Sequence, residues 1–136
     1  MKILAIETSC DETSIAIVEA KGGLKRPHFV IFKNIVSSQI KVHRPFGGVV
    51  PNLAKREHLK NLPKILKTLV ASGYTLNPDL IAVTVGPGLE PALWTGIEFA
   101  KNLAKSLKRP LIGANHMEGH LYSNWFPVRV ISKSKF

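Results

Sequence analysis

The sequence is poor in cysteine and contains no long apolar run. Its 136 residues include one cysteine, Cys10, which excludes an internal disulfide and favours a reducing compartment. No apolar run reaches the length of a membrane span. The first residues also have too short an apolar core for a signal peptide. The sequence therefore predicts a cytoplasmic protein with no membrane partner.

Acidic residues are also scarce. The chain has 9 Asp and Glu against 19 Lys and Arg, a formal net charge of +10. Such an excess attracts polyanions and speeds the encounter with them. The basic residues are spread along the chain rather than gathered in a tail, so the charge alone fits a nucleic-acid contact and a merely soluble basic surface equally well. Hydrophobic residues make up 45% of the sequence, which predicts one folded domain over residues 1–136.

The first part of the chain has the pattern of three antiparallel strands. Apolar, β-rich segments at residues 2–7, 14–19 and 29–36 are separated by turns. The first turn, residues 8–13, is long and polar, with the sequence Thr-Ser-Cys-Asp-Glu-Thr. These residue types are common in ordinary turns. The turn is long for a hairpin, which favours a functional loop over an ordinary turn. Such a loop could bind phosphate through its backbone N–H groups or hold a hydrated Mg²⁺ through Asp11.

The middle of the chain has the pattern of a loop and then a long helix. Residues 37–48 are interpreted as a loop, and a helix is expected from Pro51 until Gly73 ends it. Pro63 lies within this helix and is expected to kink or split it. Three polar residues on its early turns are interpreted as a solvated face: Arg56, Glu57 and His58.

A glycine-rich turn follows the next strand. Residues 80–85 are apolar apart from Thr84, as in a strand covered on both faces, and they lead directly into Gly86-Pro87-Gly88. A helix is expected over residues 91–107, and a short strand over 111–113. A glycine-rich turn between a buried strand and a helix is a good place for phosphate or nucleotide. Gly-Pro-Gly is also the simplest tight turn, and it matches neither the Walker loop nor the dinucleotide-binding fingerprint.

Two histidines stand four residues apart in the next predicted helix. Asn115 followed by Glu118 is typical of a helix start, and His116 and His120 would share one helix face. Both imidazoles could then bind one metal ion such as zinc, iron, copper or nickel. Two side chains do not complete such a site, and the pair could instead be polar surface. Glu118 does not directly follow His116, so the metalloprotease pattern is excluded.

The predicted order of elements is β-β-β-α-β-α-β-α. A meander followed by alternating strands and helices predicts an α/β fold, with a mixed five-stranded sheet and helices on its faces. Residues 126–136 have the pattern of a strand start and show no clear stop signal.

Four stretches, taken together, resemble one protein family. They are Ile6-Glu7-Thr8-Ser9-Cys10-Asp11-Glu12-Thr13, then Phe46-Gly47-Gly48-Val49-Val50-Pro51 with Ala54 and Arg56-Glu57-His58, then Gly86-Pro87-Gly88-Leu89, and finally Asn115-His116-Met117-Glu118-Gly119-His120. In this order and spacing the chain resembles the N-terminal half of the TsaD/Kae-type (YgjD/Gcp) family of tRNA threonylcarbamoyladenosine biosynthesis. The element order is also that of half of an actin-like ATPase, a ribonuclease H-like fold.

The resemblance implies a transferase that moves a threonylcarbamoyl group from threonylcarbamoyl-AMP to N6 of the adenosine beside the anticodon of tRNA. It implies His116 and His120 as ligands of one divalent metal, iron or zinc. It places Asp11 and Glu12 as catalytic residues in the active-site turn, and Ser9, Cys10, Gly86, Pro87 and Gly88 at the substrate or nucleotide. Implied partners are tRNA, threonylcarbamoyl-AMP or ATP with Mg²⁺, and TsaB-like, TsaE-like or archaeal and eukaryotic subunits.

The family's chains continue into a second domain that carries a third metal ligand, and residues 128–136 depart from the family's pattern. The isolated chain is therefore expected to be inactive or nearly so. Two alternatives remain open: a small actin-like ATPase or sugar kinase, and a non-catalytic dimerising scaffold of the TsaB type. The kinase would have no use for His116 and His120, and TsaB-type relatives lack the pair. A homodimer also remains open.

Overall fold

The computed structural model describes residues 1–23, 25–124 and 128–130, and its centre is a single mixed sheet. The strands are β1 (Lys2–Glu7), β2 (Glu12–Lys21), β3 (His28–Ser38), β4 (Leu80–Gly86), β5 (Leu111–Asn115) and β6 (Val128–Val130). They lie in the order β5-β4-β1-β2-β3-β6. The five predicted strands are confirmed, and the sheet gains the short β6 within the segment that has the pattern of a strand start.

The direction of the strands follows from their connections. β1, β2 and β3 are joined by short turns and are antiparallel, with Ile6 opposite Ile15 in the first pair. β4 returns beside β1 in the parallel direction, and β5 is parallel to β4. β6 lies parallel to β3 at the other edge.

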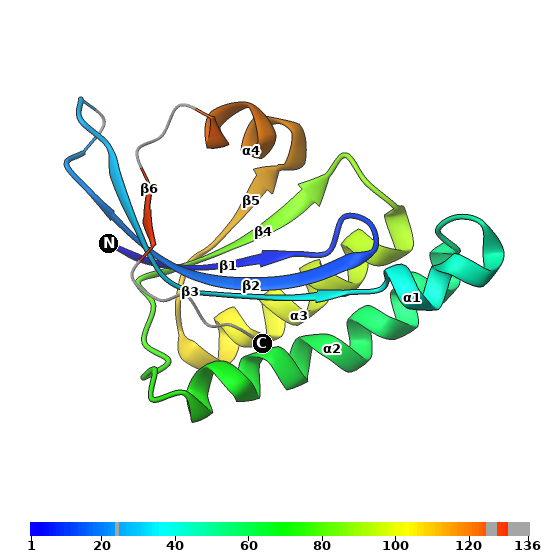
Figure 1. Ribbon diagram of the computed structural model, residues 1–136. Coiled ribbons are helices and arrows are strands. Elements are labelled where there is room, and N and C mark those ends of the chain that lie inside the picture. The colour runs from blue at the N-terminus through cyan, green and yellow to red at the C-terminus, as the bar shows by residue number, and fades with distance from the viewer. Residues whose placement is uncertain (24, 125–127, 131–136) are drawn as a thin grey trace.

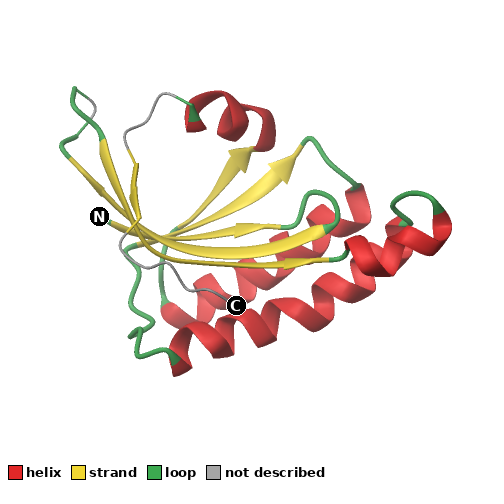
Figure 2. Cartoon of the chain, in the orientation of Figure 1, coloured by secondary structure: helices red, strands yellow, loops and turns green. Residues whose placement is uncertain are grey.

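Two long helices cover one face of the sheet. They are α2 (Pro51–Ala71) and α3 (Glu90–Leu107), which lie side by side beneath the strands in Figures 1 and 2. A third helix, α4 (His116–Ser123), follows β5 on the opposite side of the sheet. The helices expected after Pro51, over residues 91–107 and at the histidine pair are therefore all present.

The core lies between the sheet and the two long helices. Alternate strand residues point to this face, as the two-residue period of a strand requires: Leu4, Ile6, Ile15, Ile17, Ile81 and Val83. They pack against Leu62, Ile65 and Leu69 of α2 and the small Ala100 and Ala104 of α3. Complete burial of each large aliphatic side chain contributes about 1.5–3 kcal/mol. This packing fixes the strands that carry the site.

One local prediction in the middle of the chain is wrong, and one of the two alternatives predicted for Pro63 is excluded. Residues 37–48 are not a plain loop, because they include α1 (Ile40–His43) and the 3₁₀ turn η1 (Arg44–Phe46). Pro63 does not split the following helix, since α2 runs on as one helix of 21 residues. The core contacts of Leu62 and Ile65, on either side of the proline, hold both halves of α2 on the sheet.

Candidate functional site

Three strands end at one edge of the sheet. β1 ends at Glu7, β4 at Gly86 and β5 at Asn115, and the three strands are parallel to one another. Their carboxyl ends therefore meet, which is where open α/β sheets bind ligands. Three connections leave from this edge: the 8–11 loop, the glycine-rich turn before α3, and helix α4 (Figure 1). Each carries one of the predicted motifs.

Backbone hydrogen bonds to neighbouring segments hold the 8–11 loop in place. The Ser9 carbonyl accepts a hydrogen bond of 2.8 Å from the Leu89 N–H, and the Asp11 carbonyl accepts one of 2.8 Å from the Gln39 N–H. Its polar side chains are not all open to solvent. Thr8 is fully buried and its hydroxyl donates to the Ala92 carbonyl at 3.0 Å, while Ser9 is 5% exposed. Only Cys10 and Asp11 remain accessible in this loop.

The glycine-rich turn lies directly against this loop. A Cβ on Gly88 would stand 2.6 Å from the Ser9 carbonyl oxygen, closer than any real Cβ contact. Gly88 is therefore needed for the two connections to touch. Gly86 has φ of 148°, a conformation that favours glycine, and Pro87 and Gly88 are exposed at the rim. Predicted substrate-binding residues from two distant motifs, Ser9 and Gly88, are thus neighbours.

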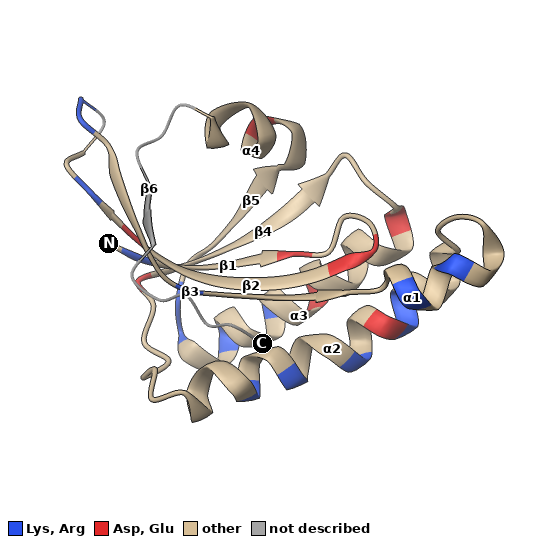
Figure 3. Ribbon diagram, viewed as in Figure 1, with Lys and Arg blue, Asp and Glu red and all other residues tan. Residues whose placement is uncertain are grey.

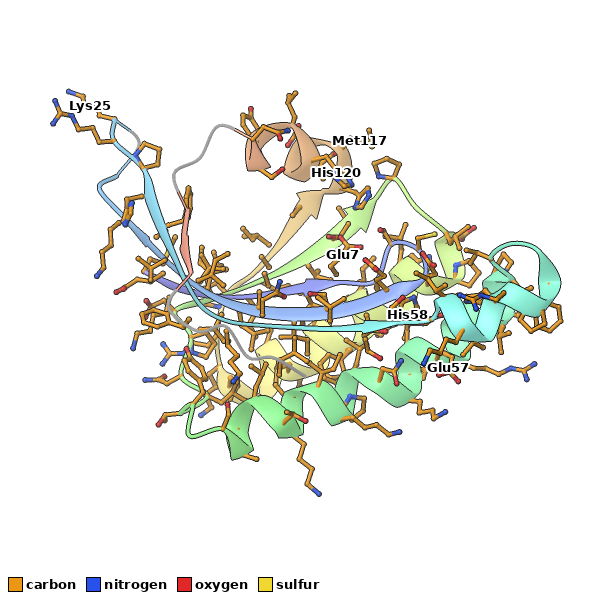
Figure 4. All side chains as sticks on the ribbon, in the orientation of Figure 1. Glu7, Lys25, Glu57, His58, Met117 and His120 are labelled. Carbon is orange, nitrogen blue, oxygen red and sulfur yellow. The ribbon has the colours of Figure 1, made fainter. Side chains whose placement is uncertain are left out.

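Glu7 joins the end of β1 to the histidine helix, and Figure 4 shows its side chain pointing toward α4. Its carboxylate accepts hydrogen bonds from the Ser9 N–H and the Thr84 hydroxyl, and Oε2 lies 3.3 Å from His116 Nδ1. Burial by itself would raise the pKa of Glu7. The hydrogen bonds from Ser9, Thr84 and His116 outweigh this effect and hold the pKa below its usual value. Glu7 is therefore an ionised acceptor at neutral pH.

The two histidines point at each other. Asn115 caps α4, as predicted, because its side chain accepts from the N–H groups of Met117 at 2.9 Å and Glu118 at 3.1 Å. His116 Nε2 and His120 Nε2 are 3.0 Å apart. Two metal–nitrogen bonds of about 2.1 Å place their nitrogens roughly 3 to 3.4 Å apart at octahedral or tetrahedral angles, so this spacing is compatible with two ligands of one ion.

The donor set stops at two side chains. Within residues 1–23, 25–124 and 128–130, no three His, Cys, Asp or Glu side chains are grouped so as to hold a metal ion. An imidazole pair suits zinc, iron, copper or nickel, and any of these ions would need further donors. Cys10 is not ready to supply one as a thiolate. Partial burial raises the pKa of its thiol, and the hydrogen bond and charge of Asp11 raise the pKa further.

Asp11 and Glu12 lie away from this pair along the loop. Asp11 borders a hollow of about 360 Å³ together with His43, Arg44, Gly47 and Gly48. Glu12 is exposed as the first residue of β2. The structure thus brings together Ser9, Gly88 and His116, and it places Asp11 at an adjoining hollow with a basic side chain on its rim.

A buried polar network supports the loop from below. His58 is fully buried, so its interpretation as part of a solvated face is wrong. Its Nε2 donates to the Cys10 carbonyl at 3.0 Å, and its Nδ1 accepts from the Thr13 hydroxyl at 2.8 Å. Gln39 Nε2 lies 3.3 Å from His58 Nδ1, and Gln39 Oε1 accepts from His43 Nε2 at 2.9 Å. Hydrogen bonds from α2 and from the start of α1 therefore support the backbone of the 8–11 loop next to Asp11.

Sequence reasoning missed Glu7 and His58 as parts of the site. Each stands inside one of the four motifs, but Glu7 closes an apolar strand and His58 lies in a charged run. Strand periodicity offered one signal for Glu7: counting in twos from the core residues Leu4 and Ile6 puts Glu7 on the opposite face, where α4 begins. The contact of His58 with the first loop depends on tertiary packing.

The chain matches a known family. A model of the family described as tRNA N6-adenosine threonylcarbamoyltransferase matches residues 30–132. The chain belongs to this family. A curated relative of that name from Thermosipho melanesiensis is 50% identical over 127 residues, covering 92% of this chain and 37% of the relative. Another from Fervidobacterium nodosum is 51% identical over 128 residues, covering 92% of this chain and 35% of the relative. The chain therefore spans little more than a third of these relatives.

Solved structures agree on the fold. YeaZ from Pseudomonas aeruginosa superposes with a TM-score of 0.58 at 21% identity, covering 90% of this chain and 49% of YeaZ. RuvC from Thermus thermophilus superposes with a TM-score of 0.57 at 12% identity, covering 91% of this chain and 68% of RuvC. At these identities the likeness confirms the actin-like, ribonuclease H-like fold and carries no further function.

Proposed function

We propose that this chain forms the N-terminal part of a tRNA N6-adenosine threonylcarbamoyltransferase. The observation that carries the proposal is the convergence of His116 and His120 at the edge where the three parallel strands end, in a chain of this family. The reaction would form a bond from the adenosine N6 to the carbamoyl carbon of threonylcarbamoyl-AMP. The bond from that carbon to the phosphate oxygen would break, and AMP would leave with the electron pair.

The residues divide this work by position. His116 and His120 would hold iron or zinc, which supplies positive charge for the carbamoyl oxygen or the departing phosphate. The exposed Pro87 and Gly88 and the accessible Cys10 would line the substrate. Asp11, beside the 360 Å³ hollow, would accept the proton that N6 loses, and the exposed Glu12 would assist it.

The partners follow from the same proposal. The substrate is tRNA together with threonylcarbamoyl-AMP, and further subunits of the modification complex would bind to the assembled enzyme. Since the chain covers 37% of its Thermosipho relative, the remaining length would supply the rest of the site. The isolated chain is then expected to transfer no threonylcarbamoyl group.

A chimera tests the proposal. The corresponding segment of the Thermosipho melanesiensis relative is replaced by this chain, and transfer to tRNA is measured with threonylcarbamoyl-AMP. We expect transfer by the chimera, and its loss together with loss of bound metal in His116→Ala/His120→Ala. A folded chimera that binds metal but transfers nothing would contradict the proposal and favour the scaffold alternative. Transfer by the isolated chain would contradict its expected inactivity.

A further inference from the structure

Glu7 has no assigned role, although its carboxylate contacts the helix that carries the histidine pair. Glu7 Oε2 lies 3.3 Å from His116 Nδ1, and Ser9 Oγ lies 3.2 Å from the same nitrogen. Glu7 is anchored by two donors of its own, the Ser9 N–H and the Thr84 hydroxyl. Its position is therefore fixed by β1 and β4 rather than by α4.

The contact decides which imidazole nitrogen carries the proton. An ionised carboxylate can only accept hydrogen bonds, so the His116 nitrogen that faces it must be the one bearing hydrogen. Ser9 Oγ can accept from the same N–H. With Nδ1 protonated, the lone pair of neutral His116 is on Nε2, the atom that faces His120. A carboxylate behind a ligating histidine is the usual device that fixes its tautomer.

The second histidine must then be in the opposite state in the metal-free chain. The 3.0 Å contact between the two Nε2 atoms needs one hydrogen between them, and His116 has none to offer. His120 therefore carries its proton on Nε2 and donates it to His116. Metal binding would require His120 to lose that proton to solvent and to take one at Nδ1, with no net proton release.

We propose that Glu7 is the positioning residue of the histidine pair: it holds His116 ready to bind metal, whereas His120 changes tautomer when metal arrives. The metal part of this inference rests on the proposed function. The tautomer part concerns the metal-free chain alone.

Nuclear magnetic resonance tests it directly. The chain is labelled with ¹⁵N in its histidine rings, freed of metal with a chelator and kept near pH 8, where imidazole is neutral. The signals of the pair are assigned with His116→Ala and His120→Ala. We expect the proton on Nδ1 of His116 and on Nε2 of His120. His116 protonated at Nε2 in the wild type would overturn the proposal, and this measurement needs no change at Glu7.

Zinc titration of Glu7→Gln supplies the second measurement. This substitution keeps the size of the side chain and removes its charge, and we expect zinc affinity to fall about 10–100-fold. We also expect His116 to lose its preference for Nδ1–H. Glu118→Gln is the matched control, because Glu118 is an exposed carboxylate on the same helix, and its zinc affinity should be unchanged. Equal affinity in Glu7→Gln and wild type would overturn the proposal.

The two proposals fail in different ways. A wild-type chain that shows the expected tautomers and binds no zinc would count against the metal part of the proposed function while confirming the hold of Glu7 on His116. A wild-type chain that binds zinc but carries the His116 proton on Nε2 would support the metal part of the proposed function and overturn the role of Glu7.

Discussion

At the scale of single residues, the site depends on polar groups that are removed from water. His58 shows this best: it is fully buried, and its two nitrogens are used by the Cys10 carbonyl and the Thr13 hydroxyl. Burial lowers the pKa of His58, although its hydrogen bond to Cys10 and the charges of Glu7 and Asp11 oppose that change. His58 is therefore neutral in the folded chain near pH 7. A positive charge there would be buried beside His43.

Stability should consequently depend on pH through His58. Its pKa is lower in the folded chain than in the unfolded one, so its contribution is present above about pH 6.5 and is lost as the pH falls through the lowered value. We expect the free energy of unfolding to fall between pH 7.5 and 5 more steeply in the wild type than in His58→Gln, which cannot titrate. Urea unfolding at several pH values measures both slopes. Parallel curves for the two proteins would show that His58 does not set this dependence.

At the scale of elements, the site requires close packing of α3 on the first loop. Thr8 reaches across to α3, where its hydroxyl donates to the Ala92 carbonyl. Gly96, one helical turn further, makes room for it, since a Cβ there would lie 2.2 Å from Thr8 Oγ1. α3 can therefore approach the end of β1 only with glycine at this position.

Gly96→Ala should separate these elements. We expect a loss of about 1–3 kcal/mol in the free energy of unfolding, as for other overpacked sites. Gly119→Ala is the control, because it also lies in a helix but its Cβ would meet nothing within 4 Å. That variant should instead gain about 0.5–1 kcal/mol from helix propensity. Equal effects in urea unfolding of the two variants would contradict the packing argument.

The elements themselves were predictable from the sequence for local reasons. The first three strands, the Asn115 cap and the Pro51 helix start were each predicted from neighbours along the chain, and all are confirmed. The predictions that failed depended on distant contacts. Pro63 is tolerated in α2 because Leu62 and Ile65 bury on the sheet, and His58 is buried because Cys10 and Thr13 come to meet it. The assignment of His116 and His120 to one metal stays a prediction, although their facing nitrogens agree with it.

At the scale of the whole molecule, charge is unevenly placed. Figure 3 shows Lys and Arg positions, coloured blue, along the ribbon of α2, on the side of the molecule away from α4. Five exposed ones follow this helix: Lys55, Arg56, Lys60, Lys64 and Lys67. The described part of the chain contains no helix suited to crossing a membrane. We expect this surface to attract a polyanion, such as the tRNA of the proposed function.

Binding of tRNA by the chain should accordingly weaken with salt. We expect the logarithm of the binding constant to fall linearly with the logarithm of salt concentration. Lys64→Gln/Lys67→Gln should reduce that slope by about 1 for each phosphate that the variant no longer neutralises. Lys25→Gln is the control, because Lys25 lies at the far tip of the β2–β3 turn (Figure 4). Filter binding over a salt series gives the slopes, and an unchanged slope in the double variant would place the tRNA on another face.

The position of Glu7 also links metal affinity to folding. His116 and His120 are close in sequence, so an unfolded chain could still bind zinc through both, whereas Glu7 reaches them only after β1, β4 and β5 have paired. Zinc stabilises the fold only to the extent that the folded chain binds it more tightly than the unfolded chain does. If Glu7 accounts for a 10–100-fold excess, saturating zinc would raise the free energy of unfolding by about 1.4–2.7 kcal/mol, since each tenfold step is worth about 1.4 kcal/mol. The affinity for zinc would then differ between a chain whose sheet is assembled and one whose sheet is not.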